Sequence, residues 1–223
     1  MTRKYKHSPS AISCFKTCPR QFQEKYLNGN YRDYSSPAMQ RGTLIHSNIE
    51  NYLTHLTHLT QSEELIVDIQ YLKPFLDKIK NSPGEVLVEQ KLAIDRDGVA
   101  CDYKSEDAYL RSISDCIIIN DDTKSIRVID WKTGKQRNYS YQADAIVKCL
   151  RGIPKYKDYN IKVLFYFVDL NLHDVYEYKD IDTILNKIDV CIQEDNFEPT
   201  PSGLCLGWCP VKTCKFNGHY GLD

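Results

Sequence analysis

Apolar and polar residues follow two different patterns on either side of residue 84. Up to that point apolar residues recur every three or four positions, which is typical of helices that bury one face. Ser8 and Pro9 supply the start signal of the first helix, an N-cap followed by proline. The helices predicted from this spacing cover residues 8–28, 38–58 and 62–79.

Beyond residue 84, short apolar runs alternate with turn signals, which indicates strands. The predicted strands cover residues 86–94, 109–119, 125–131, 161–170 and 175–178. Helical spacing returns at residues 139–150 and 180–194. This order predicts an α/β fold in which helices flank a central mixed β-sheet.

The chain has a length suited to one medium domain, and no linker divides it. We therefore expect a single domain over residues 1–223. Its expected parts are a helical N-terminal part (1–84), an α/β core (85–195) and a cysteine-rich tail (196–223).

The composition indicates the cellular location of the protein more clearly than its activity. No apolar run approaches the roughly 20 residues that span a bilayer, and the polar, basic N-terminus is unlike a secretion signal. We therefore expect an intracellular, cytoplasmic protein that does not bind membranes. The net charge of −1 gives no hint of nucleic acid, although basic residues cluster in 1–32 and 132–137.

Two carboxylates and a lysine stand out on the second and third predicted strands. A hairpin between these strands would bring Asp115 next to Asp130, and side-chain alternation would point Lys132 the same way as Asp130. Paired carboxylates among apolar neighbours are costly unless a divalent cation lies between them. Such a group suits phosphodiester hydrolysis. The alternative is that both acids merely pair with Lys or Arg at strand ends, since an Asp-X-Lys tripeptide is common by chance.

The order of motifs resembles a known family. Ser114-Asp115 followed by Val128-Ile-Asp130-Trp-Lys132-Thr-Gly134 is similar to the core of the PD-(D/E)XK nucleases. Arg41-Gly-Thr-Leu-Ile-His46, Tyr141-Gln142 and the segment from Ser10 to Phe22 narrow the resemblance to the RecB-like branch, which includes phage exonucleases and nucleases of CRISPR spacer acquisition. The resemblance implies a restriction-endonuclease-like core and DNA cleavage with Mg²⁺ or Mn²⁺.

Individual roles follow from this resemblance alone. It implies that Asp115, Asp130 and the Trp131 carbonyl bind the metal, with His46 as a ligand or close beside it, while Lys132 completes the catalytic group. Gln142 would contact the phosphate backbone or orient Lys132, although Ile146 stands where the family has tyrosine. The residues expected to contact DNA are Arg20, Arg41, Lys135 and Arg137.

Two of these positions have a second interpretation. Glu89, on the first strand, is an outer ligand of the metal site or a residue that supports its ligands; otherwise it is a solvent-facing strand residue. His46 is a ligand or a solvated helix histidine, as we expect His55 and His58 to be.

Nine cysteines are unevenly placed, and an odd count in a reducing compartment argues against disulfides. Cys205, Cys209 and Cys214 lie in one short segment, and Cys18 is the best candidate for a fourth thiolate, with Cys14 or His219 as substitutes. One early and three late cysteines resemble the [4Fe-4S] site of some RecB-like nucleases. The three residues between Cys205 and Cys209, where the family has two, leave Zn²⁺ as the rival.

We therefore predict a metal-dependent deoxyribonuclease, an exonuclease in replication, recombination or repair that acts on single- or double-stranded DNA ends and works with a replication or recombination protein. The alternative is a non-catalytic module that binds DNA or a partner protein and carries a metal–thiolate site. A redox protein is disfavoured, because the chain has no nicotinamide or flavin glycine fingerprint.

Overall fold

The computed structural model describes residues 5–31, 36–54 and 65–219, and they fall into two compact units. Unit 1 comprises Met1–Tyr34 and Asp180–Asp223, and unit 2 comprises Ser35–Lys179. The units cut across the three parts expected from the sequence, because the first helix and the last predicted helix pack in the same unit. Among the described residues, no helix is long and apolar enough to cross a membrane.

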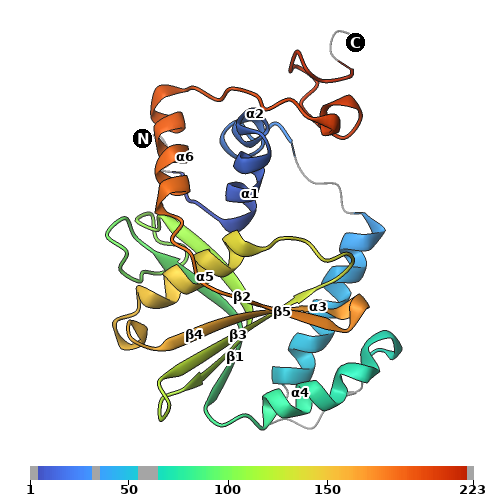
Figure 1. Cartoon of the computed structure of the whole chain (residues 1–223), viewed down its shortest axis with the longest axis vertical. Helices are drawn as coiled ribbons and strands as arrows, with labels where there is room; N and C mark the ends of the chain where they lie inside the picture. The colour runs from blue at the N-terminus through green and yellow to red at the C-terminus, as the bar shows by residue number, and fades with distance from the viewer. Residues whose placement is uncertain (1–4, 32–35, 55–64, 220–223) are drawn as a thin grey trace. The chain divides into compact units, whose positions relative to one another are not determined.

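Unit 2 contains a five-stranded sheet in the order β1-β2-β3-β4-β5 (Figure 1). β3 and β4 run parallel and the other neighbours antiparallel, which confirms the predicted mixed sheet flanked by helices. The strands are β1 (Glu85–Ile94), β2 (Leu110–Asn120), β3 (Ser125–Lys132), β4 (Asn160–Phe167) and β5 (Leu172–Tyr176). The predicted strand 161–170 ends earlier, because Val168–Leu170 forms a 3₁₀ turn.

Side-chain alternation divides the sheet into two buried faces. Val128 of β3 packs on the face covered by α5 (Ser140–Arg151), the helix that connects the parallel strands β3 and β4. Ile129, its neighbour, packs on the opposite face beneath α3 (Pro37–Thr54) and α4 (Lys73–Lys80). Because both faces are covered, β3 lies in the interior of unit 2, and its Asp130 is buried there.

The helices before the sheet differ from the prediction in detail. α3 ends its described part at Thr54, so the predicted end of this helix, together with His55 and His58, lies outside the described residues. The predicted helix 62–79 begins outside them as well. Its described part is a 3₁₀ segment (Val67–Leu72) followed by α4. Pro74 lies in the first turn of α4, where its missing N–H does not remove a helical hydrogen bond.

Unit 1 begins with helices that are shorter than predicted. α1 (Pro9–Thr17) ends at Cys18, which is extended at φ −162° because the following Pro19 disfavours the helical conformation. α2 (Pro19–Phe22) and a π-helical turn (Gln23–Leu27) continue the chain, and α6 (Asp182–Glu194) packs with α1. Phe22 forms the centre of the core of this unit, in ring contact with Phe15 and Phe197.

Candidate active site

The site forms where β2 and β3 separate. Their pairing ends at Cys116 and Ile129, one position before Asp115 and Asp130 would face each other in the same register. The Asp115 carboxylate occupies this opening and accepts a hydrogen bond of 2.7 Å from the backbone N–H of Trp131. Its side chain is only 13% exposed, so the fold fixes it in a largely dry position.

Glu89 lies across from Asp115 on the neighbouring strand. The register that pairs Val88 with Cys116 and Gln90 with Ser114 places Glu89 opposite Asp115, where the regular pairing is interrupted. Glu89 has φ 51°, a left-handed conformation that is unfavourable for a residue with a side chain and unusual inside a strand. Strained backbone of this kind concentrates at functional sites.

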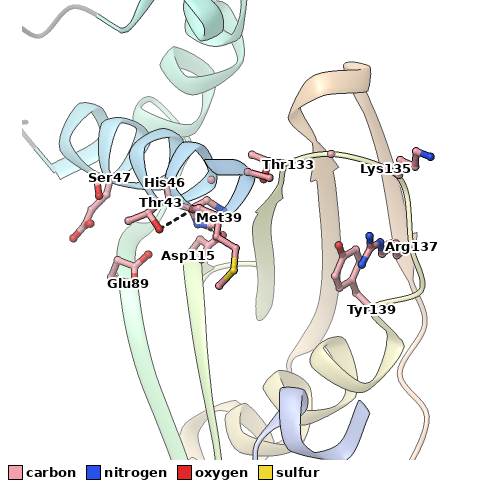
Figure 2. A pocket seen from close by; sticks show the side chains of 14 residues that line it. Met39, Thr43, His46, Ser47, Glu89, Asp115, Thr133, Lys135, Arg137 and Tyr139 are labelled. Atoms are coloured by element: carbon pink, nitrogen blue, oxygen red, sulfur yellow. Dashed lines mark hydrogen bonds and ion pairs between the residues drawn. The ribbon is translucent and has the colours of Figure 1, made fainter. Parts of the chain in front are cut away.

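α3 supplies the third member of the group. His46 Nδ1 lies 3.4 Å from Asp115 Oδ2. Ligand atoms of His46, Glu89 and Asp115 all lie within 4.8 Å of one another, and their side chains point toward one another in Figure 2. One imidazole and two carboxylates form a donor set suited to a divalent cation.

The charges of this group influence one another. Burial opposes protonation of His46, but the hydrogen bond and the charge of Asp115 outweigh it and raise the pKa of the imidazole. Burial and the negative charges of Asp115 and Glu50 raise the pKa of Glu89. Without a cation, the neighbouring carboxylates therefore repel one another. A bound cation would relieve this repulsion.

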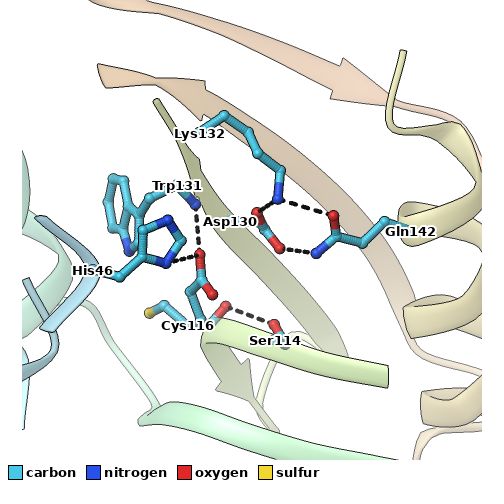
Figure 3. Close-up of polar contacts among 8 residues, drawn as sticks. His46, Ser114, Cys116, Asp130, Trp131, Lys132 and Gln142 are labelled. Carbon is cyan, nitrogen blue, oxygen red and sulfur yellow. Dashed lines mark hydrogen bonds and ion pairs between the residues drawn. The ribbon is translucent and has the colours of Figure 1, made fainter. Parts of the chain in front are cut away.

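Asp130 forms a second group with Lys132 and Gln142 (Figure 3). Its carboxylate is fully buried, makes an ion pair with Lys132 Nζ and accepts a hydrogen bond from Gln142 Nε2. Lys132 Nζ donates to Gln142 Oε1 at 2.9 Å and lies over the ring of Tyr139. Burial and the charge of Asp115 raise the pKa of Asp130 to about 7, against the opposing effect of Lys132.

The residues predicted for catalysis and metal binding, together with Glu89, thus fall into two adjoining groups. The first group consists of His46, Glu89 and Asp115, whose ligand atoms are closely spaced. The second contains Asp130, which is paired with Lys132. Trp131 contributes its N–H to Asp115, while its indole packs against Phe75 and Tyr166.

An open cleft of about 700 Å³ is lined by the first group, His46, Glu89 and Asp115. One face of α3 forms a wall, Glu89 and Asp115 form part of the floor, and residues 133–139 form the opposite rim (Figure 2). Lys135 and Arg137 are exposed on this rim. Glu50 also lines the cleft, one helical turn after His46, and was not among the residues predicted from the sequence. Its four-residue spacing from His46 was the available signal.

Arg41 connects α3 to the rim through Asp169, a residue that the sequence analysis did not identify. Arg41 Nη2 lies 2.8 Å from Asp169 Oδ1, and Asp169 Oδ2 accepts the backbone N–H of Gly134. A Cβ atom on Gly42 would lie 3.1 Å from Thr133 Oγ1, so the close approach of helix and rim favours glycine there. Arg41 is therefore already engaged by a carboxylate.

Arg20, the other predicted DNA contact, belongs to unit 1. It makes an ion pair of 2.8 Å with Glu24 and donates to Gln23 Oε1 at 2.7 Å. It also borders a small pocket in unit 1 that is lined by Cys18, Cys205, Cys209 and Cys214. The structure thus collects the four cysteines predicted to share a site around one pocket.

The comparison with protein families agrees with this architecture. The sequence profile of the PD-(D/E)XK nuclease superfamily matches residues 6–214, and the chain belongs to this superfamily. In fold, the chain is similar to the protein described as "Crystal structure of SSO0001", with a TM-score of 0.51 and 13% sequence identity over 96% of this chain and 88% of that chain. At this identity the likeness concerns the fold alone. A comparison with curated proteins gave no match.

Proposed function

We propose that this protein is a deoxyribonuclease that hydrolyses phosphodiester bonds with Mg²⁺ or Mn²⁺. The observation that carries the proposal is the convergence of His46, Glu89 and Asp115 at the opening between β2 and β3, next to Asp130 and Lys132. Membership of a nuclease superfamily supports the same interpretation.

The residues present fit a hard divalent cation, because two carboxylates repel each other at close range and an imidazole completes the donor set. Asp115, Glu89 and His46 would hold the ion, with Asp130 and the Trp131 carbonyl as further ligands. A bound ion of this kind lowers the pKa of water and neutralises charge on a phosphate.

The remaining residues orient the reacting groups. Gln142 accepts from Lys132 and donates to Asp130, so it fixes both side chains in one arrangement. We propose that Lys132 contacts the scissile phosphate and stabilises the charge that develops there. The exposed Lys135 and Arg137 on the rim of the cleft would contact neighbouring phosphates of the strand.

The finer assignment is also a proposal. The motifs around His46, Lys132 and Gln142 favour a RecB-like exonuclease that acts on DNA ends in the cytoplasm during replication, recombination or repair, together with a protein of that pathway. The open cleft is compatible with a strand end entering between α3 and the rim.

The test is digestion of end-labelled single- and double-stranded DNA with Mg²⁺ or Mn²⁺. Asp115→Ala and Lys132→Ala should each lower cleavage by at least about a hundredfold, and EDTA should abolish it. The matched control is Asp122→Ala, which removes an exposed carboxylate from the turn of the same hairpin and should cut normally. Full activity in purified Asp115→Ala protein would overturn the proposal.

We further propose that Cys18, Cys205, Cys209 and Cys214 hold a [4Fe-4S] cluster, with Zn²⁺ as the alternative. The four cysteines border one pocket, which suits a shared thiolate site. Four thiolates suit either a cubane cluster or tetrahedral zinc, and the resemblance of one early and three late cysteines to some RecB-like nucleases favours the cluster.

A further inference from the structure

Three large apolar side chains that lie close together in the sequence are exposed in the C-terminal segment of unit 1. Leu204, Leu206 and Trp208, within five consecutive positions, are 52%, 74% and 82% exposed. Trp is usually among the more buried residue types, and neighbouring exposed apolar side chains mark surfaces that bind something.

The backbone beneath these side chains is held in place. Ser202 caps the short 3₁₀ helix Gly203–Leu206, and the N–H of Trp208 donates to the Leu204 carbonyl at 3.0 Å. Gly218 donates to the Cys205 carbonyl at 2.9 Å, and a Cβ atom at Gly218 would lie 2.6 Å from the Leu206 carbonyl oxygen. Trp208 is therefore displayed from a fixed turn.

The same segment also has an interior of its own. Val211 and Asn217 are buried, and Asn217 Nδ2 donates to the Cys209 carbonyl at 2.9 Å. The segment thus buries some of its residues and leaves Leu206 and Trp208 outside. Their exposure is a property of this surface and does not reflect a segment without packing.

The charge of this surface favours an anionic partner. Residues 199–219 contain no Asp or Glu, whereas Lys212, Lys215 and His219 are all exposed there. Lys215 Nζ lies 5.1 Å from the ring centroid of Phe216, which places a cation beside a second accessible aromatic ring. Exposed aromatic rings between cations are the chemistry that binds unpaired nucleotides.

We propose that this surface, defined by Leu204, Leu206, Trp208, Lys212, Lys215 and Phe216, binds single-stranded DNA, with an unpaired base stacked on Trp208. The inference deepens the proposed function, on which it rests for the identity of the nucleic acid. Bases of an intact duplex are already stacked on one another, so the ring of Trp208 selects strands with free bases. A protein partner would also contact Leu206, but the absence of carboxylates from residues 199–219 favours a phosphate backbone.

Intrinsic fluorescence offers a direct test, because the chain has two tryptophans and their exposure differs greatly. Trp131 is 2% exposed and Trp208 is 82% exposed. Titration of the full chain in EDTA with oligo(dT) of about 15 nucleotides should quench the emission of Trp208 through stacking. A duplex of equal length should quench it much less, and Trp208→Phe should retain binding but abolish the signal.

Affinity measurements on variants give the second readout. Trp208→Ala should raise Kd for oligo(dT) about 5- to 150-fold, the effect of removing one stacked base. The double variant Lys212→Gln, Lys215→Gln should bind single-stranded DNA with a weaker dependence on salt. The slope of log K against log salt concentration should become shallower by about 0.7 for each phosphate that the protein no longer neutralises. Val190→Ala removes an exposed apolar side chain elsewhere in unit 1 and should leave Kd unchanged.

Three results would overturn the proposal. The first is Trp208 emission that does not change at saturating oligo(dT). The second is an unchanged Kd for Trp208→Ala protein that melts at the wild-type temperature. The third is a change in the self-association of that variant without any change in its affinity for DNA. Failure of the proposed function would look different. Quenching by oligo(dT) without metal-dependent cleavage would refute the nuclease and support the surface, whereas cleavage without quenching would do the reverse.

Discussion

Glu89 combines two unfavourable features at one position. Its backbone is left-handed in the middle of a strand, and burial, together with the negative charges of Asp115 and Glu50, raises the pKa of its carboxylate. A residue selected for stability would have neither feature. Such a combination is expected where a side chain serves to bind a cation and the rest of the fold holds it there.

Glu89→Asn should therefore separate stability from activity. Asn tolerates the left-handed conformation and removes the charge, so the metal-free protein should gain about 1 kcal/mol in its free energy of unfolding. Cation affinity should fall at least about tenfold. Thermal melting in EDTA and titration with Mn²⁺ measure the two effects.

Glu85→Asn provides the matched control for Glu89. Glu85 lies on the same strand, is exposed, and does not have the left-handed backbone of Glu89. Its replacement should change neither the cation affinity nor the stability appreciably. Lower stability of Glu89→Asn in EDTA would contradict the interpretation of strain at this position.

At the residue scale, the sequence indicated which residues belong to the site better than it indicated how their side chains are placed. Asp115, Asp130 and Lys132 could be predicted to converge, because side-chain alternation and a hairpin suffice for that inference. The place of Glu89 beside His46 and Asp115 depends on a positive φ, and no local sequence signal indicates that conformation in a glutamate. The role of Asp169 depends on two contacts that span 128 and 35 positions of the chain.

At the scale of elements, Asp169 holds the 133–139 rim against α3. It follows β4 in the turn Val168–Leu170 and contacts Arg41 on one side and Gly134 on the other. Arg41 therefore has a positioning contact in addition to any contact with DNA. The rim carries Lys135 and Arg137, so its position determines where those cations meet a substrate.

Asp169→Asn should loosen this connection. The variant should be less stable by about 1 kcal/mol at neutral pH. Because the rim binds the substrate strand in the proposed function, KM for DNA should rise more than kcat falls. Steady-state kinetics on labelled DNA separates the two parameters. Asp122→Asn, on an exposed turn, should leave both unchanged.

The contact between Asp169 and Arg41 should also make the stability of the protein depend on pH. The hydrogen bond and charge of Arg41, with help from Gly134, lower the pKa of Asp169. A lowered pKa means stabilisation that is complete above the ordinary aspartate value of about 4 and is lost as pH falls through the folded value. The difference in melting temperature between wild type and Asp169→Asn should be full at pH 7 and shrink near about pH 3. A difference that grows in acid would contradict this account.

The positions of strands and helices could be predicted from periodicity, with boundaries mostly within a few residues. β1, β2, β3 and α5 match their predicted ranges closely, because apolar alternation and helical spacing reflect burial directly. The first helix was predicted too long, because its apolar spacing continues through Cys18 while Pro19 breaks the backbone geometry. The division into two units was not predictable, since no composition change marks their boundaries.

At the scale of the whole molecule, the four cysteines that border the pocket belong to the smaller unit. Cys18 comes from its N-terminal part and Cys205, Cys209 and Cys214 from its C-terminal part, and all four border one pocket. A shared metal there would tie together two parts of unit 1 that are far apart in the sequence. Binding free energy of such a site becomes folding free energy.

If the proposed [4Fe-4S] cluster is present, purified wild-type protein should be brown and absorb near about 400 nm. Cys18→Ser or Cys209→Ser should abolish this colour and lower the melting temperature. The matched control is Cys191→Ser, on α6 of the same unit, which should keep both the colour and the melting temperature. Absorbance spectra and iron analysis decide the outcome. Colourless wild-type protein with one bound zinc would assign the site to Zn²⁺ instead.

The composition of unit 1 has a consequence for synthesis on the ribosome. The five strands of unit 2 are all available once residue 179 has emerged, so the sheet can assemble while translation continues. The residues at the start of the chain must wait for α6 and the last three cysteines before their own core and thiolate pocket can close. Phe15 and Phe22, although made early, are therefore among the last aromatic residues to be covered.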